Sequence, residues 1–476
     1  MPVHPPGPLP PRRAAPLPAA VDVVVIGAGT AGAAAAAFVA ESGARVLCVD
    51  RAPLDAAGAR WINGVPAWAF DRAGLDQPTG AERRGEATPV HLIAGGERVV
   101  IADHGVLEVD MRHLVTRLQA RARNAGAELI GETAVRGRDG DHLVTDQGRV
   151  RAGVFVDASG LAGAHLLPLP RVPAHHLCAA AQEVREVADL AAARAWFAAH
   201  EVPPGEIACF AGVAGGFSVL NVRLDEHDGT VSILTGSIPV GDTPSGKAIL
   251  DRFAAGKAWV GATRFGGARA LPLRRSYDRI AAGRVAVLGD AACQMFPAHG
   301  SGIGVGMIAA RLLADALAGG GGLRAYEVAW QRGYGGLCAG YDVFRRFSQR
   351  LDEAAIARMM RAGLLDPVLA RAGMAQHTPS LPLAAIPGKV AALAREPAIG
   401  RALLATVGRM TAVRALYAAY PTHAAAVPAW GRLVAPLFGE RADPAPDRQK
   451  VATVGAQVEG GRHGERSHAG RTPAHR

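Results

Sequence analysis

The chain has 476 residues, 49% of them hydrophobic, so it is long enough to bury more than one core. Its net charge of +10 comes almost wholly from arginines spread between acids along the chain, a distribution that argues against a nucleic acid as partner. Five widely separated cysteines form no Cys-x-x-Cys pair, which excludes the usual zinc and disulfide-exchange motifs, predicts no metal site and favours a reducing, cytoplasmic location.

The two ends of the chain have little to bury. Residues 1–20 are Pro-rich and residues 441–476 are polar, so we expect a disordered leader and a disordered tail. No uninterrupted apolar stretch of about 20 residues occurs, which predicts no transmembrane segment and leaves open a peripheral contact with a membrane.

The first predicted unit is a strand over residues 21–26, a glycine turn, a helix over 31–42 and a second strand over 45–50. Gly27 allows the tight turn, Gly29 the close approach of backbone to a pyrophosphate, and Gly32 the packing of helix against strand. Asp50 stands where a carboxylate accepts from a ribose hydroxyl. This spacing predicts a dinucleotide site. Three neighbouring residues are further candidates for cofactor binding: Thr30 and Ala31 after the glycine turn, and Arg51 after the second strand.

Further along, an amphipathic helix is predicted over residues 111–125, and a buried strand from residue 154 enters a second small-residue turn that ends at Gly160. Over residues 161–280 the pattern becomes alternating, with a hairpin turning at Asp228 and Gly229. An inserted antiparallel sheet of this kind is either a substrate platform or purely structural.

A third strand begins at residue 284 and turns at Gly289, and a helix is predicted over 305–317. Residues 323–440 are helical in pattern. The predicted fold class is α/β, with a three-layer, Rossmann-like nucleotide domain (21–160 and 281–322), the inserted sheet (161–280) and the helical region. No second glycine motif follows a strand, so no separate nicotinamide domain is expected.

The three strand-and-turn segments together resemble the FAD-dependent superfamily of para-hydroxybenzoate hydroxylase, geranylgeranyl reductases and flavin halogenases, over roughly residues 20 to 320. The resemblance implies that Asp290 contacts the ribityl or phosphate end of FAD. It also implies that a following segment lies along the isoalloxazine ring, with candidates Pro297, Gly300, Ser301, Gly302 and Ile303. The helix after this segment would direct its N-terminal dipole at the reduced ring.

The same resemblance implies a phosphate contact for Arg112, although an exposed arginine at a helix start is the plainer interpretation. It also places Arg60, Asn63 and Gly64 near the flavin. His299 is the candidate catalytic residue, as a proton donor or a shield for the flavin, with a loop histidine as the alternative.

The chain lacks the early lysine and the Trp-x-Trp-x-Ile-Pro segment of flavin halogenases. We therefore expect an FAD-dependent monooxygenase that acts on an apolar or aromatic small molecule through a flavin C4a-hydroperoxide. NADH or NADPH would visit transiently, or a partner reductase would donate electrons. A geranylgeranyl-reductase-like reductase of carbon–carbon double bonds and a non-redox cyclase or isomerase are the alternatives.

Overall fold

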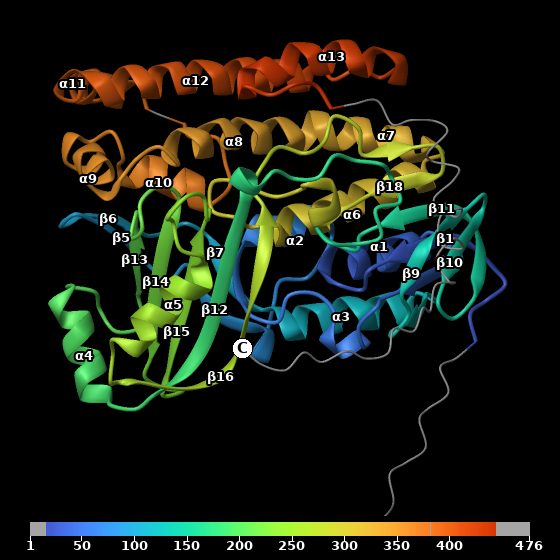
Figure 1. Ribbon diagram of the computed structural model, residues 1–476, viewed down its shortest axis with the longest axis horizontal. Coiled ribbons are helices and arrows are strands. Elements are labelled where there is room, and N and C mark those ends of the chain that lie inside the picture. Colours follow the sequence, from blue (N-terminus) through green and yellow to red (C-terminus); the bar gives the residue numbers. More distant parts are fainter. Residues whose placement is uncertain (1–15, 381, 444–476) are drawn as a thin grey trace, which may run out of the picture.

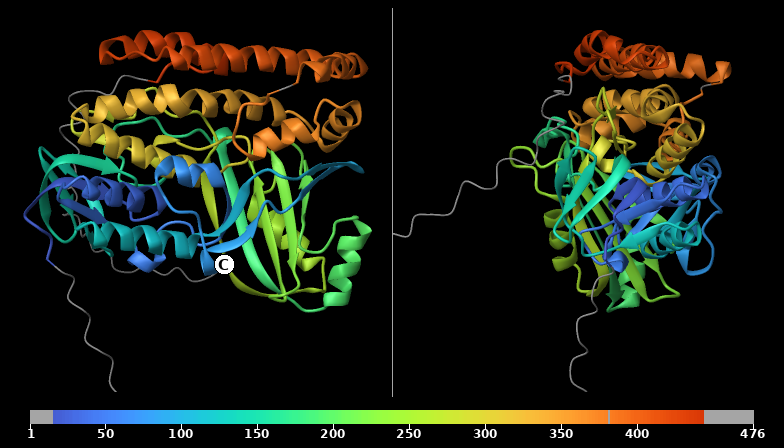
Figure 2. Two further views of the ribbon diagram at one scale, coloured as in Figure 1. Left: turned by 180° about the vertical axis from the view of Figure 1, so that it is seen from behind. Right: turned by 90° about the vertical axis from the view of Figure 1, so that its right-hand side faces the viewer.

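The computed structural model describes residues 16–380 and 382–443, and the predicted leader and tail fall mostly outside them. Three sheets and a stack of helices make up the described part (Figure 1). An eight-stranded sheet lies at one end, a seven-stranded sheet at the other, and helices form two layers above both, as the views in Figure 2 also show. This mixed α/β architecture agrees with the predicted fold class.

The eight-stranded sheet carries the glycine turns. Its strands are β17 (Ala281–Ala282), β18 (Val285–Val287), β11 (Arg149–Asp157), β1 (Ala20–Ile26), β2 (Val46–Val49) and β8 (Glu128–Ile130) in spatial order, with β10 (His142–Thr145) and β9 (Val135–Asp139) branching from β11. Strands β18, β11, β1, β2 and β8 run parallel. Helix α1 (Thr30–Glu41) lies beside the sheet and packs on both α3 (Met111–Asn124) and α6 (Ile303–Ala318).

The register of this sheet decides where the turns lie. Ile26 pairs with Asp157, Asp157 with Val287, and Ile26 with Val49, so four strands end in line. The carboxyl ends of parallel strands meet at one edge, where ligands bind in open α/β sheets. The three small-residue turns and Asp50 therefore leave the sheet together.

The seven-stranded sheet is antiparallel except for one pair. Its strands are β16 (Val260–Pro272), β12 (Leu177–Val187), β15 (Thr230–Ser237), β14 (Ser218–Asp225), β13 (Ile207–Ala211), β5 (Val90–Ala94) and β6 (Glu97–Ile101). The hairpin predicted around Asp228 and Gly229 is β14–β15. The sheet extends beyond the predicted unit of residues 161–280, because β5 joins β13 in parallel and brings β6 with it.

A small three-stranded sheet links the two larger ones, and helices cover the remaining faces. Its strands are β3 (Ile62–Pro66), β7 (Val106–Asp110) and β4 (Arg83–Glu86). Helix α2 (Ala67–Ala73) packs on α6, and α5 (Gly246–Ala255) packs on the seven-stranded sheet. Helix α4 (Leu190–Ala199) lies at the far end of that sheet (Figure 1).

The C-terminal region is helical as predicted. Its helices are α7 (Gly322–Trp330), α8 (Gly336–Ser348), α9 (Glu353–Ala362), α10 (Pro367–Met374), α11 (Ile386–Arg395), α12 (Pro397–Ala418) and α13 (Val427–Val434). Helices α11 to α13 form the outermost layer and lie over α8 (Figure 1). None of the helices in the described ranges combines the length and apolar character needed to cross a bilayer.

Buried charges join this region to the strands below it. Glu440 lies 3.2 Å from the imidazole of His176 and 3.5 Å from the guanidinium of Arg275, and it also accepts from Arg346. Burial opposes its ionisation, but the hydrogen bond from His176 and the arginine charges hold the pKa of Glu440 well below its usual range. Asp443, within the predicted tail, accepts a 2.8 Å hydrogen bond from a backbone N–H of the core, so this part of the tail prediction is wrong.

Candidate functional site

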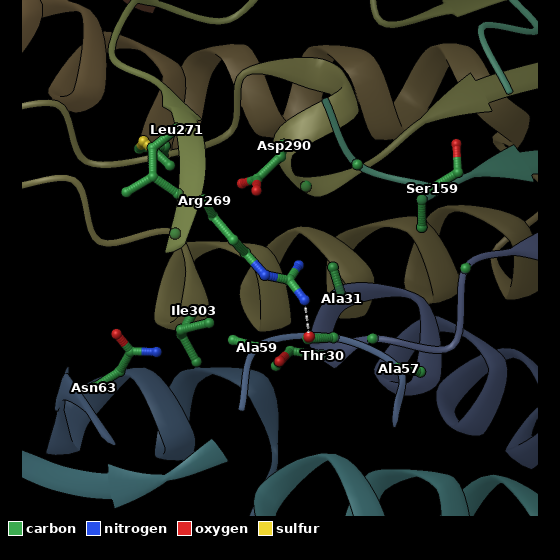
Figure 3. A pocket seen from close by; sticks show the side chains of 18 of the residues that line it. Thr30, Ala31, Ala57, Ala59, Asn63, Ser159, Arg269, Leu271, Asp290 and Ile303 are labelled. Atoms are coloured by element: carbon green, nitrogen blue, oxygen red, sulfur yellow. Dashed lines mark hydrogen bonds between the residues drawn. The ribbon is translucent and has the colours of Figure 1, made fainter. Parts of the chain in front are cut away.

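The three turns enclose a cavity of about 260 Å³, here called the turn cavity (Figure 3). Asn63 and Ile303 lie toward one end and Ser159 toward the other. Its walls come from the turns after β1, β2, β11 and β18, the segment before β3, strand β16 and the start of α6. The lining residues predicted from the sequence are Gly27, Gly29, Thr30, Ala31, Asp50, Arg51, Asn63, Gly160, Gly289, Asp290, Gly300, Ser301, Gly302 and Ile303.

Two positions, one in the turn after β1 and one in the first turn of α1, admit only glycine. Gly27 has φ +100°, and a Cβ there would lie 2.5 Å from the carbonyl oxygen of Ala158. A Cβ on Gly32 would overlap the carbonyl oxygen of Gly27. These two positions hold the turn and the helix in place, and so aim the start of α1 at the cavity.

Two helix N-termini open onto the turn cavity. Helix α1 begins after Gly29 and helix α6 after Gly302, and neither N-cap residue supplies a side-chain cap. Both caps line the cavity, as do the first helical residues Thr30 and Ile303. Unsatisfied N–H groups and the positive end of the helix dipole favour an anion at such positions. The cavity therefore offers one anion site at each of two separated helix starts.

Asp50 is half-buried at the end of β2. One of its carboxylate oxygens accepts a 2.7 Å hydrogen bond from the Ala28 N–H, and the other a 2.8 Å bond from the Ala52 N–H. A carboxylate has about four acceptor positions, so two remain for a ligand hydroxyl. The backbone bonds hold the carboxylate in place at the wall of the turn cavity.

Asp290 faces the cavity from the turn after β18. Removal from solvent raises the pKa of its carboxyl to about 6, against a counteracting effect of the Arg269 charge. Its carboxylate lies close to the start of α6, since a Cβ on Gly302 would be 3.3 Å from Oδ1. A carboxyl of this kind is half-protonated near pH 6, and so can donate as well as accept a hydrogen bond.

Arg269 is the main residue that the sequence did not reveal. It projects from β16 across the cavity, between Asp290 and the loop that carries Ala57 and Ala59, and donates to the Gly58 carbonyl (Figure 3). Together with Arg51 it supplies the cationic side chains among the lining residues. Gly58 was missed as well, although its φ is +76° and a Cβ there would lie 3.0 Å from the Gly29 Cα, so it is part of the site.

Six predicted site residues lie outside the lining of the turn cavity: Gly32, Arg60, Gly64, Arg112, Pro297 and His299. Gly32 acts through packing, as described. Arg112 is held by a bidentate pair with Asp110 and stacks 3.8 Å from the Phe265 ring centroid, so the predicted phosphate contact finds no support in this geometry. Gly64 and His299 line the neighbouring cavity instead.

That neighbouring cavity, about 300 Å³, lies against the face of the seven-stranded sheet and is here called the sheet cavity. Most of its wall is apolar, from strands β12 to β15 and from β5 and β7. Residues common to both cavities are Trp61, Asn63, Leu271, Gly300 and Ser301. The two cavities therefore adjoin where α6 begins.

Polar groups occupy a few defined places in the sheet cavity. Glu108 of β7 and Arg223 of β14 form a 2.5 Å ion pair, and Thr88 donates a 2.6 Å hydrogen bond to the same carboxylate. Asn221 lies two residues before Arg223 on the same face of β14, and its side chain makes no hydrogen bond within the described residues. Asn221 is therefore a free amide in a wall that is mostly apolar.

His299 is open to the sheet cavity and packs on Phe296 at 5.0 Å between centroids. Surrounding protein atoms lower the pKa of its imidazole to about 4, because the charged form loses solvation, although part of the residue stays exposed. The ring is therefore neutral at physiological pH. A neutral ring argues against His299 as a proton donor. Its roles as a shield for the flavin and as a plain loop histidine stay open.

Residues 22–67 match the model of an FAD binding domain. This match spans the first strand, the glycine turn and the first helix of the eight-stranded sheet, so this segment is similar to an FAD binding domain. No curated protein sequence matches the chain.

Solved structures of several flavoproteins share this fold. A geranylgeranyl bacteriochlorophyll reductase-like protein from Thermoplasma acidophilum has a TM-score of 0.63 at 15% identity, over 81% of this chain and 99% of that one. A myxobacterial chondrochloren halogenase gives 0.55 at 17% identity, over 85% and 98%. A flavoprotein/dehydrogenase from Cytophaga hutchinsonii gives 0.53 at 18% identity, over 75% and 93%. At these identities the likeness is one of fold, and no substrate carries over to this chain.

The lining residues fit FAD. The uncapped start of α1 beside Gly29 suits the pyrophosphate, the two free acceptor positions of Asp50 suit a ribose, and the uncapped start of α6 suits the electron-rich edge of a reduced flavin. Gly29 and Gly58 both line the turn cavity, and a Cβ on either would lie 3.0 Å from the Cα of the other, so only side-chain-free backbone lets phosphates approach there.

Proposed function

We propose that the protein is an FAD-dependent monooxygenase whose organic substrate lies in the sheet cavity. The observation that carries the proposal is the junction of the two cavities. Five residues line both, so a molecule in the sheet cavity meets the end of the turn cavity where α6 begins. In this proposal, residues 21–160 and 281–322 serve the cofactor, and the sheet of 161–280 with β5 serves the substrate.

The chain's own residues bind and orient the reactants. FAD, when bound, supplies two-electron chemistry that a nicotinamide or a partner reductase replenishes. Asn63, Gly300 and Ser301 separate the two ligands, and the start of α6 stabilises negative charge beside them. The apolar strands exclude water from the junction, which strengthens each electrostatic interaction there.

The walls of the sheet cavity indicate the class of substrate. An apolar or aromatic body matches the alanine, leucine and valine side chains of β12, β14 and β15. Asn221 can both donate and accept, so a hydroxyl or carbonyl oxygen on the substrate would satisfy it. The Glu108–Arg223 pair is already matched and adds a polar boundary.

The charge states near the junction favour oxygenation over double-bond reduction. Reduction of a carbon–carbon double bond needs a side chain that protonates carbon after hydride transfer. In the lining of the sheet cavity, His299 is neutral and Glu108 is committed to Arg223 and Thr88. Asp290, which can donate, lines the turn cavity and not the sheet cavity. Hydroxylation consumes the substrate, O₂, NAD(P)H and a proton, and yields the alcohol, water and NAD(P)⁺, with no proton delivered to substrate carbon.

Anaerobic reduction followed by controlled addition of air tests the proposal. The purified holoprotein is reduced with NADH or NADPH, mixed with candidate apolar or phenolic substrates, and then exposed to ¹⁸O₂. We expect flavin reoxidation coupled to one ¹⁸O in the product. A saturated product formed without oxygen would support the reductase alternative, and turnover without loss of NAD(P)H would support a non-redox cyclase or isomerase.

The proposal also includes NADH or NADPH as the electron donor and a cytoplasmic location. If neither nicotinamide reduces the flavin, a partner reductase is the source. All five cysteines are unpaired and buried, which supports the proposed cytoplasmic location.

A further inference from the structure

The outermost helical layer carries an apolar surface that nothing in the described chain covers. In both figures of the whole molecule, α11, α12 and α13 lie at its edge, with no other element above them. Large side chains on or beside these helices are strongly exposed; they are here called the outer apolar face and are Leu383 (84%), Ile386 (45%), Val390 (60%), Leu404 (56%), Val407 (50%) and Leu433 (63%).

Helix α11 shows the lack of cover most clearly. Of its ten residues only Ala392 is buried, although most of the others are apolar. In α12 the buried positions are Ile399, Gly400, Thr406, Val413 and Tyr417, and Leu404 and Val407 lie among the exposed ones. A contiguous apolar surface rimmed by polar residues marks an interaction site in a folded protein.

The charge around this face has one sign. Between residues 383 and 439 the only acidic residue is Glu396, and the basic residues are Lys389, Arg395, Arg401, Arg409, Arg414 and Arg432. Lys389 is bound to Asp366, and Arg395 donates to the Ala362 carbonyl. The other four arginines form no ion pair with any described residue and are exposed. Arg401, Arg409 and Arg432 are available to an anionic partner, whereas the stem of Arg414 packs beside Gly340 of α8.

We propose that the outer apolar face docks on an anionic lipid bilayer, with α11, α12 and α13 in the plane of its surface. Leucine, isoleucine and valine side chains then enter the boundary between headgroups and acyl chains, and the free arginines contact anionic headgroups. A second copy of this chain is a poorer occupant, because a two-fold interface would bring the same arginines against each other. This inference is independent of the proposed reaction.

Vesicle sedimentation with the full-length holoprotein tests the proposal. We expect about 10-fold more protein bound to phosphatidylcholine vesicles that contain phosphatidylglycerol than to phosphatidylcholine alone, and a loss of this preference at about 0.5 M salt. The double variant Leu404→Gln, Val407→Gln should bind the anionic vesicles about 10-fold less well. The matched control, Val100→Gln with Val240→Gln, changes similarly exposed side chains elsewhere and should bind as wild type.

The arginines are tested separately. Arg401→Gln with Arg409→Gln should lower binding to anionic vesicles roughly 10-fold and leave the weak binding to neutral vesicles unchanged. Arg136→Gln with Arg252→Gln, also exposed and free of ion pairs with the described residues, is the control for net charge. The flavin spectrum and the unfolding midpoint of each variant verify that it is folded.

Three results would overturn the inference. One is wild-type protein that sediments with neither kind of vesicle. Another is equal loss of binding in the test and control variants. The third is a dimer in size-exclusion chromatography that the Leu404, Val407 variant converts to monomer, which would make a second copy the occupant.

Discussion

Replacement of Asp290 by asparagine should separate the stability of the apoprotein from its ability to bind FAD. The carboxyl is enclosed, and its pKa rises from 3.8 to about 6. A group whose pKa is raised on folding binds more protons in the native than in the unfolded state, so stability falls as pH rises from about 4 to about 6 and then stays lowered. The shift corresponds to about 3 kcal/mol above pH 7.

Asparagine has nearly the same shape and no charge, so Asp290→Asn removes this cost. We expect the apoprotein variant to be more stable than wild type by up to about 3 kcal/mol at pH 8, and by roughly half as much at pH 5. Urea denaturation of both apoproteins at the two pH values measures the difference. Asp55→Asn, an exposed carboxylate beside the same cavity, should change neither value.

The Asp290→Asn variant, although its apoprotein is more stable, should bind FAD more weakly. Asp290 lines the turn cavity beside the start of α6. Without its carboxyl, the protein loses one hydrogen bond that involves a charged group, and the Kd for FAD should rise about 10-fold. A variant that is no more stable than wild type at pH 8 would refute the argument from burial. Unchanged FAD affinity would refute the assignment of Asp290 to the cofactor.

Three further predictions concern the surroundings of the site. Arg269→Gln should raise the Kd for FAD about 10-fold and weaken its salt dependence in fluorescence titrations, whereas an unchanged Kd would mean that Arg269 swings out of the cavity on binding. Glu440→Gln should destabilise the protein by about 2 kcal/mol in urea, because it removes one of the two carboxylates that pair with Arg275 and with Arg346. Since the pKa of Glu440 is depressed in the native state, its contribution should be lost in wild type as pH falls below about 4.5, and an unfolding midpoint indifferent to pH there would contradict this. His299→Gln should leave the pH profile of turnover unchanged between pH 6 and 8, because the imidazole is already neutral, and an acidic limb near pH 6.5 that the variant abolishes would show otherwise.

Local features of the chain were predictable because they are set by neighbours in sequence. The first strand, glycine turn and helix follow from hydrophobic runs and from backbone positions that only glycine can occupy, such as Gly27 and Gly32. The β14–β15 hairpin follows from its Asp-Gly turn. Helix α6 starts at Ile303, two residues before the predicted start, because its N-cap is Gly302, which periodicity of apolar residues does not detect.

Long-range features were not predictable in the same way. Strand β5 joins the seven-stranded sheet through parallel pairing with β13, more than 100 residues later, and nothing in either segment specifies the partner. Arg269 reaches the cavity only because β16 is long and pairs with β12 along its length. Arg112 pairs with Asp110, only two residues away in the sequence. The orientation of its side chain also depends on the Phe265 ring, which comes from the distant strand β16.

Titration of the purified protein with FAD tests the central claim most directly. The account predicts a protein that is yellow as isolated, or that takes up one FAD per chain after refolding with excess cofactor. It also predicts that Gly27→Val abolishes this uptake, since a Cβ there would lie 2.5 Å from the Ala158 carbonyl oxygen. A colourless, folded wild-type protein that gains no flavin spectrum from excess FAD would contradict it.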